Sequence, residues 1–148
     1  MRVHLCAVGR LRSGPERALV DDYLTRFDRT GRALGLGPFV QHEVEDKRNL
    51  GMAAEAELLT RVVPAGAVLV CLDERGRVMS SPDFAGQLAQ WRDAGHQDVA
   101  FVVGGADGIA PASDLKSNLL GHMNRVYGKN VPTNADGGLK GDVGFIVD

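Results

Sequence analysis

Two uninterrupted apolar runs constrain the fold of this chain more than any other feature of its sequence. Residues 67–72 read Ala-Val-Leu-Val-Cys-Leu, and residues 99–103 read Val-Ala-Phe-Val-Val. Apolar runs of this length without polar alternation are typical of parallel strands that are covered on both faces. Two segments that contain β-branched residues, over 3–8 and 39–44, predict two further strands. We therefore expect a sheet whose central strands are fully buried.

Amphipathic segments separate these strands. Their apolar spacing predicts helices over residues 15–33, over residues 52–63, and from Ser81 up to Gly95. Ser13 is the expected N-cap of the first helix, because Pro15 falls in the first turn and Glu16 follows the serine by three positions. The alternation of strand and helix implies an α/β layered fold with a mostly parallel sheet.

Length and composition favour one globular domain over residues 1–148. The chain has 148 residues, of which 44% are hydrophobic and 24% charged. No apolar run approaches the roughly 20 residues that span a bilayer, and the N-terminus lacks a signal-peptide core, so we expect a cytoplasmic protein. Cys6 and Cys71 lie in apolar runs and are interpreted as buried thiols. No Cys/His cluster predicts a metal site.

The charge is distributed unevenly. The net charge is −2, but residues 1–32 hold seven arginines against four acids, an excess of +3. The remaining 10 basic and 15 acidic residues give −5, which returns the total. The N-terminal excess indicates either a surface that meets phosphate or an ordinary solvated helix face.

The ends of the two buried strands are the candidate ligand site. Ligands of open parallel sheets bind at the carboxyl ends of strands, which here fall at Leu72 and Gly104. The glycine-rich segment 102–108 lacks the Gly-Lys-Ser/Thr of a Walker A loop and is not a full GxGxxG motif. It predicts either close approach to a ligand or a tight turn. Asp73 is either an acid/base or ribose-binding group, or a turn residue.

No nucleophilic hydrolase site is indicated. The sequence has no Gly-x-Ser-x-Gly elbow and no Ser-His-Asp order. The histidines are scattered along the chain, and we interpret His4, His42 and His96 as surface or hydrogen-bonded core residues rather than catalysts.

Four segments, taken in order and at their spacing, carry a resemblance to a known family. Residues 1–11, 68–76, 79–85 and 98–108 resemble the RlmH family of SPOUT-class methyltransferases, which act on 23S ribosomal RNA. The resemblance covers residues 1–112. It implies a SPOUT fold with a C-terminal trefoil knot, a homodimer, and S-adenosylmethionine as the methyl donor. The implied substrate is N3 of a pseudouridine in the 23S ribosomal RNA of the assembled ribosome.

The resemblance also implies donor-binding residues. The matching positions are the strand end at Leu72, the glycine at Gly104, and a later loop that contains Leu120, Gly121, His122 and Met123. Methyl transfer requires positioning, and no residue here is assigned as the catalytic base. The resemblance implies no metal.

Residues 113–148 depart from the family pattern. From Val126 to Asp148 the sequence is glycine-rich, and it has no counterpart of the family's C-terminal helix or closing Tyr-His-Arg. A short strand is expected over 143–147. An alternative function is therefore a catalytically inactive homologue that still binds RNA or the ribosome. A third, an unrelated nucleotide-phosphate binder using residues 104–108, is disfavoured because that loop lacks Lys and Arg.

Overall fold

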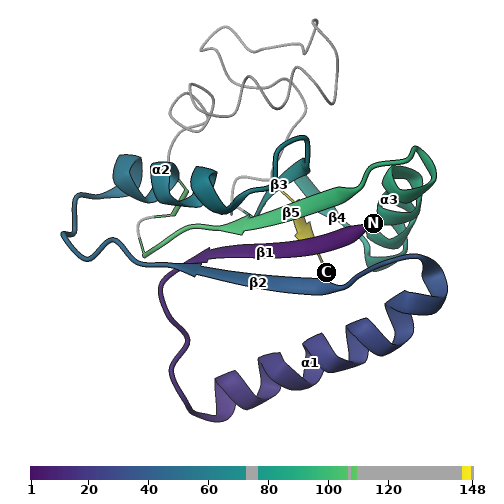
Figure 1. The fold of residues 1–148 in the computed structure, drawn as a ribbon, viewed down its shortest axis with the longest axis horizontal. Coiled ribbons are helices and arrows are strands. Elements are labelled where there is room, and N and C mark those ends of the chain that lie inside the picture. The colour runs from purple at the N-terminus through teal and green to yellow at the C-terminus, as the bar shows by residue number, and fades with distance from the viewer. Residues whose placement is uncertain (73–76, 107, 110–144, 148) are drawn as a thin grey trace, which may run out of the picture.

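A parallel sheet with helices on both faces organises the described part of the chain (Figure 1). The structure is a computed structural model that describes residues 1–72, 77–106, 108–109 and 145–147. Its elements are, in chain order, β1 (Arg2–Val8), α1 (Pro15–Gly31), the 3-10 helix η1 (Arg32–Leu34), β2 (Phe39–Val44), α2 (Met52–Val62), β3 (Val68–Leu72), β4 (Arg77–Met79), α3 (Ser81–Asp93), β5 (Asp98–Val103) and β6 (Phe145–Val147).

The main sheet has four strands in the order β2-β1-β5-β3, and every pair is parallel. Leu5 of β1 pairs with Gln41 of β2 on one side and with Phe101 of β5 on the other. The α/β class and the parallel sheet expected from the alternating pattern are confirmed. The trefoil knot stays a prediction, because the residues that would form it lie largely outside the described ones.

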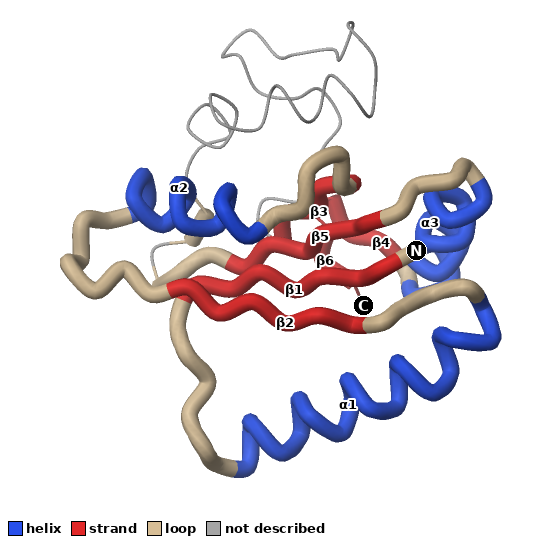
Figure 2. The backbone as a smooth tube through the Cα atoms, in the orientation of Figure 1, coloured by secondary structure: helices blue, strands red, loops and turns tan. Residues whose placement is uncertain are grey.

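Helices lie on both faces of this sheet (Figure 2), and an apolar cluster covers each face. On one face, Ala56 and Leu59 of α2 pack on Cys6, Ala100 and Val102. On the other face, Phe27 of α1 and Phe84, Leu88 and Trp91 of α3 pack around Val3, Val70, Val99 and Phe101. Strand β5 is buried from Asp98 to Val102. The uninterrupted apolar runs thus mark the strands that are covered on both faces, as expected.

The structure also contains a second, two-stranded sheet, and only one of its strands was predicted from the sequence. β6 pairs in parallel with β4, Arg77 with Phe145 and Met79 with Val147. The short strand expected over 143–147 is confirmed at Phe145–Val147, whereas no strand was predicted over residues 77–79. Three residues are too few for alternation to identify a strand, and the partner of β4 lies far along the chain.

The start of α1 differs from the expectation. The N-cap is Gly14, without a side-chain cap, so the prediction of Ser13 as N-cap is wrong. Pro15 occupies the first helical turn, which places the cap on the residue directly before it. In α3 the cap is Ser80, whose Oγ accepts a hydrogen bond from the backbone N–H of Asp83 at 3.3 Å.

Helix α1 packs less closely than its apolar spacing suggests. It ends at Gly31, where a Cβ would stand 2.8 Å from the carbonyl oxygen of Leu36 as the chain turns back. Leu19 and Tyr23 remain 58% and 59% exposed, and only Gly31 of this helix is buried. None of the described helices is both long enough and apolar enough to cross a bilayer.

Candidate functional site

The candidate site lies where β3 and β5 end side by side. Leu72, the last residue of β3, pairs with Val103, and Gly104 follows directly. The fold therefore brings together two of the residues proposed from sequence, Leu72 and Gly104. Leu72 is half-buried against the apolar cluster beneath α3. Asp73 and the loop residues Leu120, Gly121, His122 and Met123 lie outside the described residues.

The chain folds back on itself after Gly104. A Cβ on Gly104 would stand 2.3 Å from the carbonyl oxygen of Gly108 and 2.8 Å from the backbone nitrogen of Ile109. Gly108, at φ +87°, donates its N–H to the carbonyl of Gly105 at 3.0 Å. The glycine-rich exit is thus a tight turn that requires glycine, and it leaves backbone rather than side chains at the strand end.

A carboxylate that sequence reasoning missed lies against this turn. A Cβ on Gly105 would stand 2.6 Å from Oε1 of Glu55, which projects from the first turn of α2. Glu55 is half-buried, and its carboxylate has no hydrogen bond or ion pair with another described residue. Helix α2 follows β2 and so begins at the same sheet edge as the candidate site. Only this topology could have predicted the contact between Glu55 and Gly105, because no local motif marks it.

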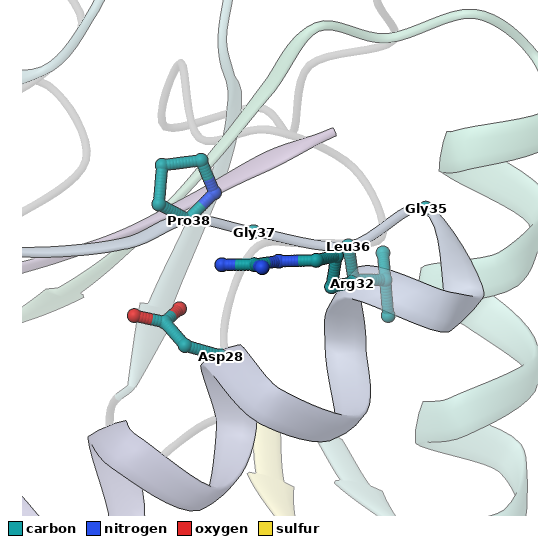
Figure 3. Close-up of a pocket in the computed structure, with 6 residues that line it drawn as sticks. All are labelled: Asp28, Arg32, Gly35, Leu36, Gly37 and Pro38. Atoms are coloured by element: carbon teal, nitrogen blue, oxygen red, sulfur yellow. The ribbon is translucent and has the colours of Figure 1, made fainter.

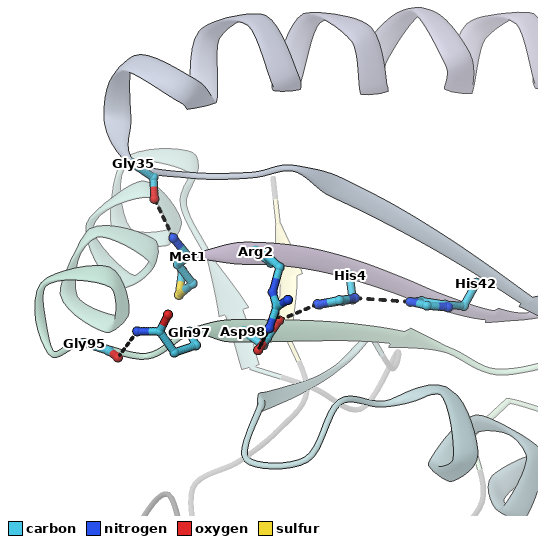
Figure 4. Close-up of polar contacts among 8 residues, drawn as sticks. All are labelled: Met1, Arg2, His4, Gly35, His42, Gly95, Gln97 and Asp98. Atoms are coloured by element: carbon cyan, nitrogen blue, oxygen red, sulfur yellow. Dashed lines mark hydrogen bonds and ion pairs between the residues drawn. The ribbon is translucent and has the colours of Figure 1, made fainter.

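His4 and His42 lie elsewhere, in a polar network with Arg2 and Asp98 (Figure 4). The guanidinium of Arg2 donates to both carboxylate oxygens of Asp98, at 2.8 and 2.9 Å. Nε2 of His4 lies 2.7 Å from Asp98 Oδ1, and Nδ1 of His4 lies 3.2 Å from Nε2 of His42. Since a carboxylate only accepts, His4 donates from Nε2, and neutral His4 accepts from His42. His4 is a hydrogen-bonded core residue, as expected.

The network shifts the acidity of its members. Burial alone would raise the pKa of Asp98, but hydrogen bonds from Arg2 and His4 outweigh it and hold that pKa below the ordinary value. Burial, and then the neighbouring charge of His4, lower the pKa of His42. If one of the two rings takes up an additional proton, the hydrogen bond between Nδ1 of His4 and Nε2 of His42 can persist. If both rings are protonated, two N–H donors face each other and this hydrogen bond is lost.

Acid is expected to destabilise the protein in two steps. Because the pKa of His42 is lower in the folded chain, stability is complete above about pH 6.5 and declines as the pH falls below it. The depressed pKa of Asp98 gives a second decline below the ordinary carboxylate range. Urea unfolding from pH 8 to pH 3 measures both. His42→Gln should flatten the first decline and leave the second, and an unchanged profile would contradict the assignment.

One recess lies apart from the candidate site. A recess of about 420 Å³ is lined by Asp28, Arg32, Gly35, Leu36, Gly37 and Pro38, where η1 turns into β2 (Figure 3). This turn precedes β2 and so lies at the amino-terminal edge of the sheet.

Cys6 is completely buried, and burial raises the pKa of its thiol to about 11. Cys71 is half-buried, more exposed than expected. Among the described residues, no cluster of His, Cys, Asp and Glu is arranged to hold a metal ion.

Comparison with known proteins identifies the family. A family model described as predicted SPOUT methyltransferase matches residues 1–123. The chain is 69% identical to a ribosomal RNA large subunit methyltransferase H from Ruegeria sp. over 112 residues, which are 76% of this chain and 72% of the relative. It is 57% identical to a protein of the same name from Cereibacter sphaeroides over 126 residues, 85% of this chain and 81% of the relative. The chain therefore belongs to the SPOUT methyltransferase family, within the group of ribosomal RNA large subunit methyltransferase H proteins.

Proposed function

We propose that this chain transfers a methyl group from S-adenosylmethionine to N3 of a pseudouridine in the 23S ribosomal RNA of the assembled ribosome. The observation that carries the proposal is the joint end of β3 and β5 at Leu72 and Gly104, in a chain of this family. The proposal includes one domain over residues 1–148, a homodimer, a cytoplasmic location and no requirement for metal.

The donor site is proposed to contain Leu72 and Gly104, with Leu120, Gly121, His122 and Met123. When bound, S-adenosylmethionine supplies an electrophilic methyl group on a positively charged sulfonium. The strand end suits such a molecule, because Gly104 carries no side chain of its own and backbone groups at this turn can hydrogen-bond the adenine edge. Leu72 and Val103 supply apolar walls beside it.

The Glu55 carboxylate supports a cationic donor in particular. It is the negative charge packed against Gly105, next to the strand end, and it has no counter-ion among the described residues. A half-buried carboxylate lowers the electrostatic potential around it, which favours a sulfonium over the neutral thioether that remains after transfer. The residues described here position the donor; the attack itself depends on holding the deprotonated N3 in line with the S–CH₃ bond.

A second candidate is an inactive homologue that binds RNA or the ribosome without methyl transfer. The sequence from Val126 to Asp148, which has no counterpart of the family's C-terminal helix, favours it. Retained ribosome binding without donor binding would distinguish this candidate from the enzyme.

Calorimetric titration of the purified protein tests the proposal. We expect one S-adenosylmethionine bound per subunit, and labelled methyl transfer to bacterial ribosomes that lack the modification. Glu55→Gln should weaken S-adenosylmethionine binding by about three- to tenfold, since it removes one charge near the sulfonium. It should leave binding of neutral S-adenosylhomocysteine unchanged. No heat from a folded sample would contradict the proposed enzyme, and equal weakening of both ligands would contradict the role of Glu55.

A further inference from the structure

We propose that four cations on two adjacent loops, Arg10, Arg12, Lys47 and Arg48, bind the phosphate backbone of the RNA beside the candidate donor site. We call these residues the loop cations. The inference rests on the proposed function for the identity of the partner, and it adds the surface on which that partner docks.

The two loops begin side by side at one edge of the sheet. β1 and β2 are parallel neighbours, and the backbone N–H of Gly9 donates to the carbonyl of Val44 at 2.8 Å, just beyond the end of β1. The N–H of Leu11 then donates to the Glu43 carboxylate at 3.2 Å, which fastens the first loop to β2. In Figures 1 and 2 both loops leave the strand ends at the left, the edge at which β5 also ends. The loop cations and Gly104 therefore share the carboxyl edge of the sheet.

The second loop is held in a defined turn by Asp46. Its carboxylate accepts the backbone N–H of Arg48 at 3.3 Å and that of Gly51 at 3.0 Å. Its carbonyl accepts the N–H of Asn49 at 3.1 Å. The Asp46 carboxylate thus bonds backbone rather than a cation, and the turn presents the exposed side chains of Lys47 and Arg48.

Three of the other N-terminal arginines are paired with acids, unlike the loop cations. Arg2 pairs with Asp98, Arg17 with Asp21 and Glu43, and Arg26 with Asp22. The loop cations are exposed, and none forms an ion pair with a described residue. Glu43 already accepts from Arg17, Gln41 and the backbone of Leu11.

The two loops therefore carry a net positive charge on exposed side chains. Four cations stand against Glu45 and Asp46 in the same loops, an excess of +2. Arg10 and Arg12 contribute two exposed cations to the excess found in the first 32 residues, whereas Arg17 and Arg26 pair with acids on α1. Arginine and lysine neutralise phosphate and release counterions, so such a surface predicts salt-dependent binding of a nucleic acid.

Binding to purified bacterial ribosomes, measured between 50 and 200 mM KCl, tests the inference. The variants are Arg10→Ala/Arg12→Ala, Lys47→Ala/Arg48→Ala and all four together. The control is Arg29→Ala/Arg32→Ala, which removes two exposed cations near the opposite end of α1 that have no ion pair with a described residue. Thermal unfolding confirms that each variant is folded.

We expect the quadruple variant to bind roughly 10- to 100-fold more weakly at low salt, and its log–log salt slope to fall by about 0.7–0.9 per lost phosphate contact. Each double variant should show about half of the change in slope, and the control little change. Wild-type affinity and slope in the quadruple variant, or an equal loss in the control, would overturn the inference. Ribosome binding that depends on the loop cations, but without methyl transfer by the wild type, would uphold the surface and reject the proposed enzyme.

Discussion

We expect Gly104→Ala to lower the rate of methyl transfer by about 100-fold, the loss that a displacement of about 1 Å can produce in a positioned site. The added Cβ would stand 2.3 Å from the carbonyl oxygen and 2.5 Å from the carbonyl carbon of Gly108. Both are backbone atoms, so no side-chain rotation can relieve the clash. The turn from Gly105 to Gly108 must open, and the strand end beside Leu72 changes shape with it.

The same substitution should also lower stability, because overpacking typically costs about 1–3 kcal/mol. Single-turnover transfer to ribosomes and urea unfolding measure the two effects. Gly86→Ala is the matched control: Gly86 lies in α3, and a Cβ there meets nothing within 4 Å. It should keep the wild-type rate and gain about 0.5–1 kcal/mol from helix propensity. A Gly104→Ala protein with wild-type rate and stability would refute the close packing of this turn.

Asp98→Asn is expected to lower the free energy of unfolding at pH 7 by about 2 kcal/mol. The buried Asp98 carboxylate accepts hydrogen bonds from Arg2 and His4, and asparagine keeps its size but loses its charge. Breaking a fully buried ion pair costs about 3–5 kcal/mol. We expect less, because the Arg2 side chain is 57% exposed and recovers hydration.

Urea unfolding measures the effect of Asp98→Asn. If the slope of the unfolding free energy against urea concentration is unchanged, a shift of the midpoint reports a change in stability. Asp93→Asn is the control, because Asp93 is an exposed carboxylate that also accepts from an arginine, Arg92, at 2.8 Å. Its replacement should leave stability unchanged, as is usual for surface pairs. Equal effects of the two substitutions would mean that burial of Asp98 contributes nothing.

Much of the fold could be predicted from local sequence. The apolar runs at 67–72 and 99–103 and the helical spacing after Ser80 depend on neighbours a few residues apart, so they identified β3, β5 and α3. The proposed site residues Leu72 and Gly104 followed, because parallel strands place their ligands at carboxyl ends. The contribution of loop residues 120–123 to that site stays a prediction.

The sequence by itself determined the α/β class, the parallel strands and the family, because periodicity and motif spacing are local properties of the chain. Only the tertiary structure decided the order β2-β1-β5-β3, the pairing of β4 with β6, the Glu55 carboxylate against Gly105, and the pairing of Arg2 with Asp98. These contacts join residues far apart in the chain. Their free energy depends on burial and on the choice among many competing partners, and no local pattern encodes that choice.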